Sequence, residues 1–388
     1  MSVLMSSLTL SACLSKKSSG AASGPLPFKT PSTPLISTFL FNASDVAEPD
    51  DPDGFAGSQY DVFEALRASS AWYKQTDCRA IRIGVVDSGV DTAHPDLDGN
   101  LEGVGRNFIN GTTDVMDGQG HGTHVAGLIA AEGNNGQGTT GVCWQAKLIV
   151  AKVADDAGSA FLSDVVDGLE WVLDNNARVV NISMGTYVPG TTLSEHNQFE
   201  DAFAGVSAKA EQKDVLIVAA AGNAGANSDT NRTYPANLVS SRVIAVANNL
   251  EGQVSQPSRA PLEALYLGSN YGGRTVHVSA PGFALLSTVR NCVGTRDPKT
   301  KTCLSGNFTS MYDRKSGTSM AAPLVTGTLA LMWNHIGVGG ISGAALGELF
   351  LNYLEPHTTG SLGEPGKFLL TGAKLDMGNA LEAAAQYP

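Results

Sequence analysis

The stretch Ile81–Asp87 (IRIGVVD) is a short apolar run that stops at an acidic residue. Runs of similar length and apolar character recur further along the chain, at 147–153, 179–182, 215–221, 243–246 and 276–278. Runs this short that lack polar alternation are typical of strands buried on both faces of a parallel sheet.

A helix is predicted between the second and third of these runs. Ser163 is expected to cap it, and its apolar residues follow helical spacing: Val165, Val166, Leu169, Val172 and Leu173. Strands alternating with helices predict an α/β fold of three layers, with a mostly parallel central sheet and helices on both faces. In such sheets, functional groups gather at the carboxyl ends of the strands.

Composition narrows the class of protein. The chain has 388 residues, of which 42% are hydrophobic and 16% charged, which excludes general disorder. Its formal net charge of −12 argues against a phosphate-binding surface, so we expect no nucleic-acid partner. No run of 18 or more apolar residues occurs, so no transmembrane helix is predicted.

Three regions differ in composition. Residues 1–13 form an apolar segment that ends in the lipobox-like Leu10-Ser11-Ala12-Cys13, where Cys13 would carry a lipid; it lacks the basic residues of a signal peptide. The alternative is an N-terminus without a targeting role. Residues 14–54 are rich in Ser, Pro, Gly and Ala and are predicted to be a flexible tether. Residues 55–388 have a globular pattern.

Three motifs carry candidate chemistry. They are Val85–Asp91 (VVDSGVD), Gly120–Gly127 (GHGTHVAG) and Ser316–Pro323 (SGTSMAAP). Each alone has a structural explanation, such as a capping Asp or a helix-starting Thr-Ser turn. Together, in the order Asp, His, Ser, they match the subtilisin ordering of the catalytic triad.

Over about residues 60–388 the chain resembles the subtilisin-like serine proteases (subtilases) of bacterial type. The resemblance implies that Ser319 is the nucleophile, His121 the general base and Asp87 the orienting carboxylate. These roles agree with the chemistry, because a serine hydroxyl needs an adjacent base and a carboxylate fixes the tautomer of that base. The same resemblance makes Asn223, after the apolar Val218–Ala221, a donor of the oxyanion hole, with the Ser319 N–H as second donor.

The resemblance also implies a substrate cleft in which a peptide binds as an added strand. Its expected walls and first specificity pocket comprise Gly158, Ser159, Ser183, Met184, Gly185, Ala221 and Gly222, with Thr233 at the pocket floor.

A structural calcium site is expected by resemblance at Asp96 and Asn135, because carboxylate and amide oxygens suit this ion. A plain Gly/Asn turn is the alternative. His121 and His124 are three residues apart, but a zinc hydrolase is disfavoured because HGTH lacks the glutamate base of H-E-x-x-H.

Four cysteines besides Cys13 permit three pairings. Cys292–Cys303 is favoured because it closes a short loop. Cys78 and Cys143 either form a second disulfide or remain free buried thiols.

The predicted function is a serine endopeptidase that cuts polypeptides through an acyl-enzyme on Ser319. The chain is expected to be an exported monomer, either secreted or held at the cell envelope by a lipid on Cys13. The alternative is a catalytically silent subtilase fold that acts as a binding module at the cell envelope.

Overall fold

A computed structural model describes residues 48–52, 59–188, 193–250, 265, 268–290, 292–296, 303–308, 311–356 and 364–388. The predicted signal segment 1–13 and residues 14–47 of the predicted tether lie outside the described residues. Within the described part, no helix is long and apolar enough to cross a membrane.

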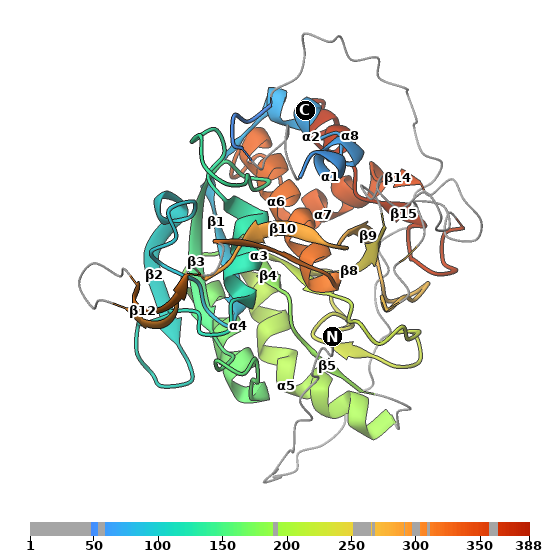
Figure 1. Ribbon diagram of the computed structural model, residues 1–388. Coiled ribbons are helices and arrows are strands. Elements are labelled where there is room, and N and C mark those ends of the chain that lie inside the picture. The colour runs from blue at the N-terminus through green and yellow to red at the C-terminus, as the bar shows by residue number, and fades with distance from the viewer. Residues whose placement is uncertain are drawn as a thin grey trace.

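A nine-stranded sheet forms the centre of the molecule (Figure 1). Every neighbouring pair in it is parallel except β14 and β15 at one edge. The strands in spatial order are β14 (Glu355–Pro356), β15 (Ala373–Lys374), β9 (Val278–Pro281), β8 (Val243–Asn249), β6 (Leu216–Ala220), β4 (Val179–Ile182), β1 (Asp77–Asp87), β3 (Gln145–Lys152) and β2 (Leu101–Asn107).

Helices cover both faces of this sheet, which confirms the predicted three-layer α/β fold (Figure 1). On one face, α3 (His121–Ala130) and α6 (Thr318–Ile336) pack with α1 (Tyr60–Ala65), α2 (Ala68–Lys74), α7 (Gly343–Asn352) and α8 (Met377–Ala385). On the other face lie α4 (Leu162–Asp174) and α5 (Leu193–Gln212).

Alternation along the strands produces the two cores. In β1, Ile83 and Val85 belong to the cluster under α3 and α6, whereas Val86 belongs to the cluster under α4 and α5. Successive side chains of a strand point to opposite faces, so a continuous apolar run buries itself in both layers.

The smaller elements are a 3₁₀ turn, η1 (Asp98–Asn100), and three antiparallel two-stranded sheets. These sheets pair β5 (Thr186–Tyr187) with β7 (Thr233–Tyr234), β10 (Leu285–Thr288) with β13 (Tyr312–Lys315), and β11 (Cys292–Arg296) with β12 (Cys303–Phe308).

Two local predictions were wrong. Helix α4 begins at Leu162 with Phe161 at the N-cap, so Ser163 lies inside the first turn and does not cap it. The β11–β12 register places Cys292 opposite Phe308 and Cys303 opposite Arg296. The two cysteines therefore lie at opposite ends of the hairpin, and a rise of about 3.3 Å per residue separates their Cα atoms beyond disulfide reach.

The Cys78–Cys143 disulfide, which the sequence left open against free thiols, is present, with Cα atoms 5.7 Å apart. Its thiols are brought together because Cys78 lies in β1 and Cys143 just before β3, and these strands are neighbours.

Residues 48–52, at the end of the predicted tether, contact the globular part. Asp51 is only 2% exposed, and its carboxylate accepts hydrogen bonds from the N–H groups of Asn134 and Asn135. Asp50 likewise accepts the N–H of Gly136. The domain boundary at 54/55 stays a prediction, but Asp50 and Asp51 are bonded to the loop after α3.

Candidate active site

Several of the predicted site residues lie at or just beyond the carboxyl ends of three neighbouring strands of the central sheet. Strand β1 ends at Asp87, β4 ends immediately before Ser183, and β6 ends three residues before Asn223. His121 opens α3 and Ser319 is the second residue of α6, and both helices lie on the same face of the sheet.

Asp87 and His121 are joined by a direct hydrogen bond. His121 Nδ1 lies 2.8 Å from Oδ1 of Asp87, which is fully buried and also accepts the N–H of Ser88. Burial by itself lowers the pKa of His121, but the charge and the hydrogen bond of Asp87 outweigh it, so the pKa lies above 6.5. Among the described residues, Oδ2 of Asp87 has no hydrogen-bond partner, and Oδ1 accepts from both Ser88 and His121.

Asp117 organises the start of α3, and the sequence analysis missed it. Its buried carboxylate accepts the N–H groups of Gln119, Gly120 and Thr123 and the hydroxyls of Ser88 and Thr123. A carboxylate is favourable at a helix N-terminus, where first-turn N–H groups have no intrahelical acceptor. Its position four residues before His121 was the available signal.

Ser319 and His121 are not hydrogen-bonded to each other in this structure. The Ser319 hydroxyl donates to the main-chain oxygen of Ser183 at 2.7 Å, and the Ser183 hydroxyl donates to the main-chain oxygen of Ser319 at 2.9 Å. This reciprocal pair ties the start of α6 to the segment after β4.

Asn223 faces the start of α6 with a fixed amide. Its Oδ1 accepts both the N–H of Thr318, at 2.9 Å, and the Thr318 hydroxyl, at 3.2 Å. Since Oδ1 is occupied, Nδ2 projects from the other side, and no partner for it is recorded among the described residues. Gly317, with φ of +147°, allows this approach, because a Cβ there would lie 3.2 Å from Asn223 Nδ2.

The expected substrate walls are partly assembled around Ser319. Ser183 contacts it directly, with Met184 and Gly185 following along the chain, and the Gly222 N–H donates to the Thr318 hydroxyl. A Cβ on Gly222 would lie 3.0 Å from Oγ1 of Thr233, so Thr233 is close to Gly222, and its place at the pocket floor stays a prediction. Gly158 lies beside Gln119, and the N–H of Ser159 donates to the carboxylate of Asp155 within the same loop.

His124 is a packing residue. It is fully buried, and its Nε2 contacts the main-chain oxygens of Leu285 and Asp313. Burial, with the charges of Lys315 and His121, lowers its pKa to about 3, so it is neutral. No cluster of three or more His, Cys, Asp or Glu side chains suited to a metal occurs in the described ranges.

Asp96 and Asn135 are brought together as predicted, through a hydrogen bond of 2.9 Å from Asn135 Nδ2 to Asp96 Oδ1. Asp51 lies nearby: burial raises the pKa of Asp96 to about 6, and the charge of Asp51 adds to that effect. No Lys or Arg is recorded in an ion pair with either carboxylate within the described structure. The two carboxylates supply the oxygen ligands that Ca²⁺ prefers, whereas Asn135 presents Nδ2 to Asp96 and its Oδ1 accepts the N–H of Gln137, so this amide would have to turn over to bind the ion.

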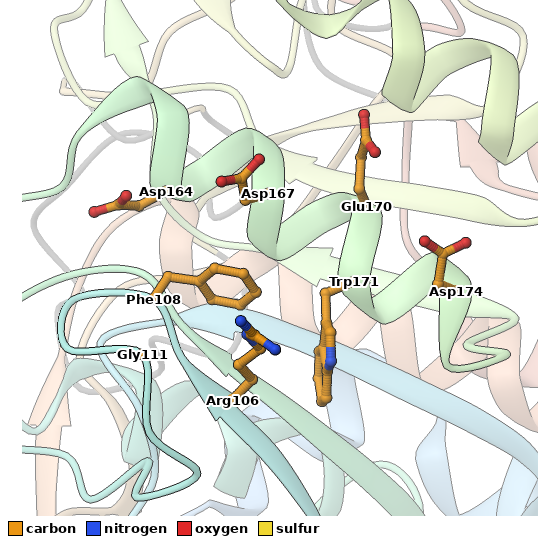
Figure 2. A pocket seen from close by; sticks show the side chains of 8 residues that line it. All are labelled: Arg106, Phe108, Gly111, Asp164, Asp167, Glu170, Trp171 and Asp174. Carbon is orange, nitrogen blue, oxygen red and sulfur yellow. The ribbon is translucent and has the colours of Figure 1, made fainter.

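A surface cavity of about 430 Å³ lies between the end of β2 and α4 and includes none of these residues (Figure 2). Four carboxylates of α4 line it, at 164, 167, 170 and 174, with Arg106, Phe108 and Trp171 opposite or between them. Lys209 pairs with Glu170 and Asp174, and Lys213 also pairs with Asp174, so two lysines offset two of these four carboxylates within the protein.

Comparison with known proteins agrees with this geometry. A family model described as the subtilase family matches residues 79–357. The "Thermophilic serine proteinase" of Bacillus sp. (strain AK1) is 35% identical over 294 residues, covering 76% of this chain and 61% of that protein. Subtilisin E of Bacillus subtilis (strain 168) is 34% identical over 65% of this chain and 55% of its own length.

The chain thus spans less than two thirds of the length of these two relatives. Among solved structures, one titled "Crystal structure of a cold adapted subtilisin-like serine proteinase" aligns with a TM-score of 0.56 and 26% identity. That alignment covers 78% of this chain and 90% of the other.

Proposed function

The chain belongs to the subtilase family, and on this premise we propose that it is a serine endopeptidase acting through Asp87, His121 and Ser319. The observation that carries the proposal is the 2.8 Å contact between Asp87 and His121. At the carboxyl ends of the neighbouring strands β4 and β6, Ser319 bonds to Ser183, and Asn223 holds the start of α6 through Oδ1.

The first step forms an ester. Rotation of the Ser319 side chain exchanges its acceptor, the oxygen of Ser183, for His121 Nε2, which takes the hydroxyl proton as Oγ attacks the peptide carbonyl carbon. The C–N bond then breaks, and His121 gives the proton to the leaving amine. Asp87, bonded to Nδ1, holds the ring in the required tautomer and stabilises its protonated form.

The second step hydrolyses the acyl-enzyme. Water loses a proton to His121, attacks the ester carbonyl, and the Ser319 oxygen leaves as that proton returns to it. In both steps the tetrahedral oxyanion is stabilised by Asn223 Nδ2 and the Ser319 N–H. The latter is a first-turn N–H of α6 and has no intrahelical acceptor.

Polypeptides are the proposed substrates. The segment Ser183–Gly185 and the loop at Gly158 and Ser159 would pair with an extended peptide, and Ala221 and Gly222 would border the side chain before the cut. Gly185 is exposed and follows the carboxyl end of β4, which leaves its main chain available for such pairing.

A fluorophosphonate probe tests the nucleophile, since it labels only an activated serine. We expect one labelled site, Ser319, in the wild-type protein and none in Ser319→Ala. Absence of labelling in folded wild-type protein would favour the alternative, a silent subtilase fold that binds partners at the cell envelope.

Calcium is proposed as a structural ion held by Asp96, Asn135 and Asp51. It would neutralise two buried carboxylates and tie residues 50–51 to the loop at 134–136, which they already contact. It has no role in the proposed chemistry.

Export is proposed with a lipid on Cys13, which lies outside the described residues. Acyl chains contribute about 0.8 kcal/mol per buried CH₂, so several chains on one residue would hold the enzyme at a membrane. Expressed in a host that processes lipoproteins, wild-type protein should partition into detergent and Cys13→Ser should not. Fully soluble behaviour of both would leave a secreted, unanchored protease, for which we expect a monomer.

A further inference from the structure

Asn270 lies beneath the segment that carries Asn223 and contacts it on both sides. Its side chain is fully buried. Nδ2 donates to the main-chain oxygen of Ala221 at 2.9 Å, before Asn223, whereas Oδ1 accepts the N–H groups of Ala224 and Ala226, both at 3.0 Å, after it. Asn223 is thus bracketed by hydrogen bonds to a single amide group.

The hydrogen-bonding capacity of this amide is fully used. The second N–H of Nδ2 donates to Oγ1 of Thr233 at 3.1 Å, and both lone pairs of Oδ1 accept hydrogen bonds, from the N–H groups of Ala224 and Ala226. A primary amide has two donors and two acceptor lone pairs, and no other side chain of this size offers that set. The main-chain N–H of Asn270 adds a bond to the oxygen of Gly222, at 2.9 Å.

The side chains just after Asn223 contribute little to holding this segment in place. Ala224 and Gly225 are exposed and their side chains are too small to pack, so hydrogen bonds must set the path of the chain there. Four main-chain bonds keep the two segments together without the side chain. They run from Gly225 to the oxygen of Gly268, from Tyr271 to the oxygen of Ala226, from Ser228 to the oxygen of Tyr271 and from Asn270 to the oxygen of Gly222. Loss of the Asn270 amide should therefore shift this loop without unfolding it.

We propose that Asn270 is a positioning residue for the oxyanion hole: it holds residues 221–226 so that Asn223 Nδ2 points at the developing negative charge. This inference rests on the proposed endopeptidase function. A small displacement of a catalytic donor is costly, and an error of about 1 Å can reduce the rate by about 10²-fold. Asn270 itself touches no reacting atom.

The test is a double-mutant cycle on kcat with a chromogenic peptide substrate. Asn223→Ala should lower kcat by about 10²–10³-fold, a magnitude borrowed from subtilisin itself. Asn270→Ala should lower kcat by up to about 10²-fold, with KM changing much less. The double variant should be no slower than Asn223→Ala. Once the Asn223 amide has been removed, Asn270 has no donor left to position, so its loss should not lower kcat further. Losses that multiply would overturn the proposal.

Asn100 provides a matched control. It is also a buried asparagine, and its amide bonds to the main chain at Ala130, Trp144 and Ala146, away from Asn223. Asn100→Ala should lower the thermal midpoint much as Asn270→Ala does while leaving kcat within about twofold. An equal loss of kcat in both variants would mean that Asn270 acts only through stability, against the proposal.

Asn270→Asp serves as the conservative variant and is decisive if Asn270→Ala does not fold. It retains the acceptors for Ala224 and Ala226 but loses both N–H donors, so its kcat should lie between those of wild type and Asn270→Ala. If Asn270→Ala does not fold, the kcat of Asn270→Asp should lie below that of wild type. Its loss should also vanish in the Asn223→Ala background. A wild-type protein that neither cleaves peptide nor labels with fluorophosphonate would overturn the proposed function itself. Normal wild-type activity with multiplicative Asn270 losses would overturn only this inference.

Discussion

Removing the Cys78–Cys143 disulfide should destabilise the protein by about 4 kcal/mol. The bond spans 65 residues of sequence, and in the chain-entropy description a crosslink closing a loop of that length removes about this much conformational freedom from the unfolded chain. The enclosed segment contains both Asp87 and His121, so the same crosslink restrains two of the three proposed catalytic residues.

The change to make is Cys78→Ala/Cys143→Ala, in a Ser319→Ala background that prevents self-digestion. Both cysteines are fully buried, so truncation adds a small cavity cost to the loss of the crosslink. Equilibrium urea unfolding, followed by tryptophan fluorescence, gives the free energy. Trp72 and Trp144 lie 5.3 Å apart by ring centroid, and Trp144 adjoins Cys143, so they report on this region.

Reductant provides the control. Treating the parent protein with dithiothreitol should bring its unfolding midpoint close to that of the double variant, whose own midpoint should not respond. Mass spectrometry establishes that the bond is intact beforehand. A loss below about 1 kcal/mol with the bond shown to be formed would refute the reasoning, because it lies well under the usual 2–4 kcal/mol.

Three further outcomes are expected. Ser319→Ala and His121→Ala should each remove nearly all peptidase activity and the double variant should be little worse, as established for subtilisin itself, whereas multiplicative losses would contradict a shared mechanism. The value of kcat/KM should rise with pH as His121 loses its proton, with a midpoint above 6.5 because Asp87 stabilises the charged ring. Because the charge of Lys315 lowers the pKa of His121, Lys315→Gln should move this midpoint upward. A kcat/KM profile that does not move would argue against His121 as the base. Calcium chelation should lower the thermal midpoint of wild type but not of Asp96→Asn, as checked by scanning calorimetry, and a midpoint unaffected in wild type would exclude a stabilising ion.

Much of the architecture followed from local sequence patterns. The runs at 81–87, 147–153 and 179–182 predicted strands that match β1, β3 and β4 to within a residue or two, apart from the earlier start of β1. A strand buried on both faces needs apolar residues at every position, and this requirement is visible without knowing its neighbours. The motifs around Asp87, His121 and Ser319 were equally apparent, because their residues are adjacent in sequence.

The partners of individual side chains could not be predicted from the sequence. The wrong Cys292–Cys303 pairing followed from counting residues, whereas the register of β11 and β12 depends on how the hairpin pairs. The acceptor of the Ser319 hydroxyl, the main-chain oxygen of Ser183, lies 136 residues away in sequence. Helix α4 starts at Leu162, two residues before the position that a cap-forming Ser163 requires.

Asn270 illustrates the limit most clearly. Its partners Ala221, Ala224 and Ala226 lie 44 to 49 residues before it, and alanine is not a residue type that indicates a functional site. Sequence by itself determined the strands, the layers and the identity of the three central catalytic candidates, because periodicity and short motifs are local properties. Only the tertiary structure decided which amide holds Asn223 and which thiols meet, because those contacts exist only after distant strands of the sheet have paired.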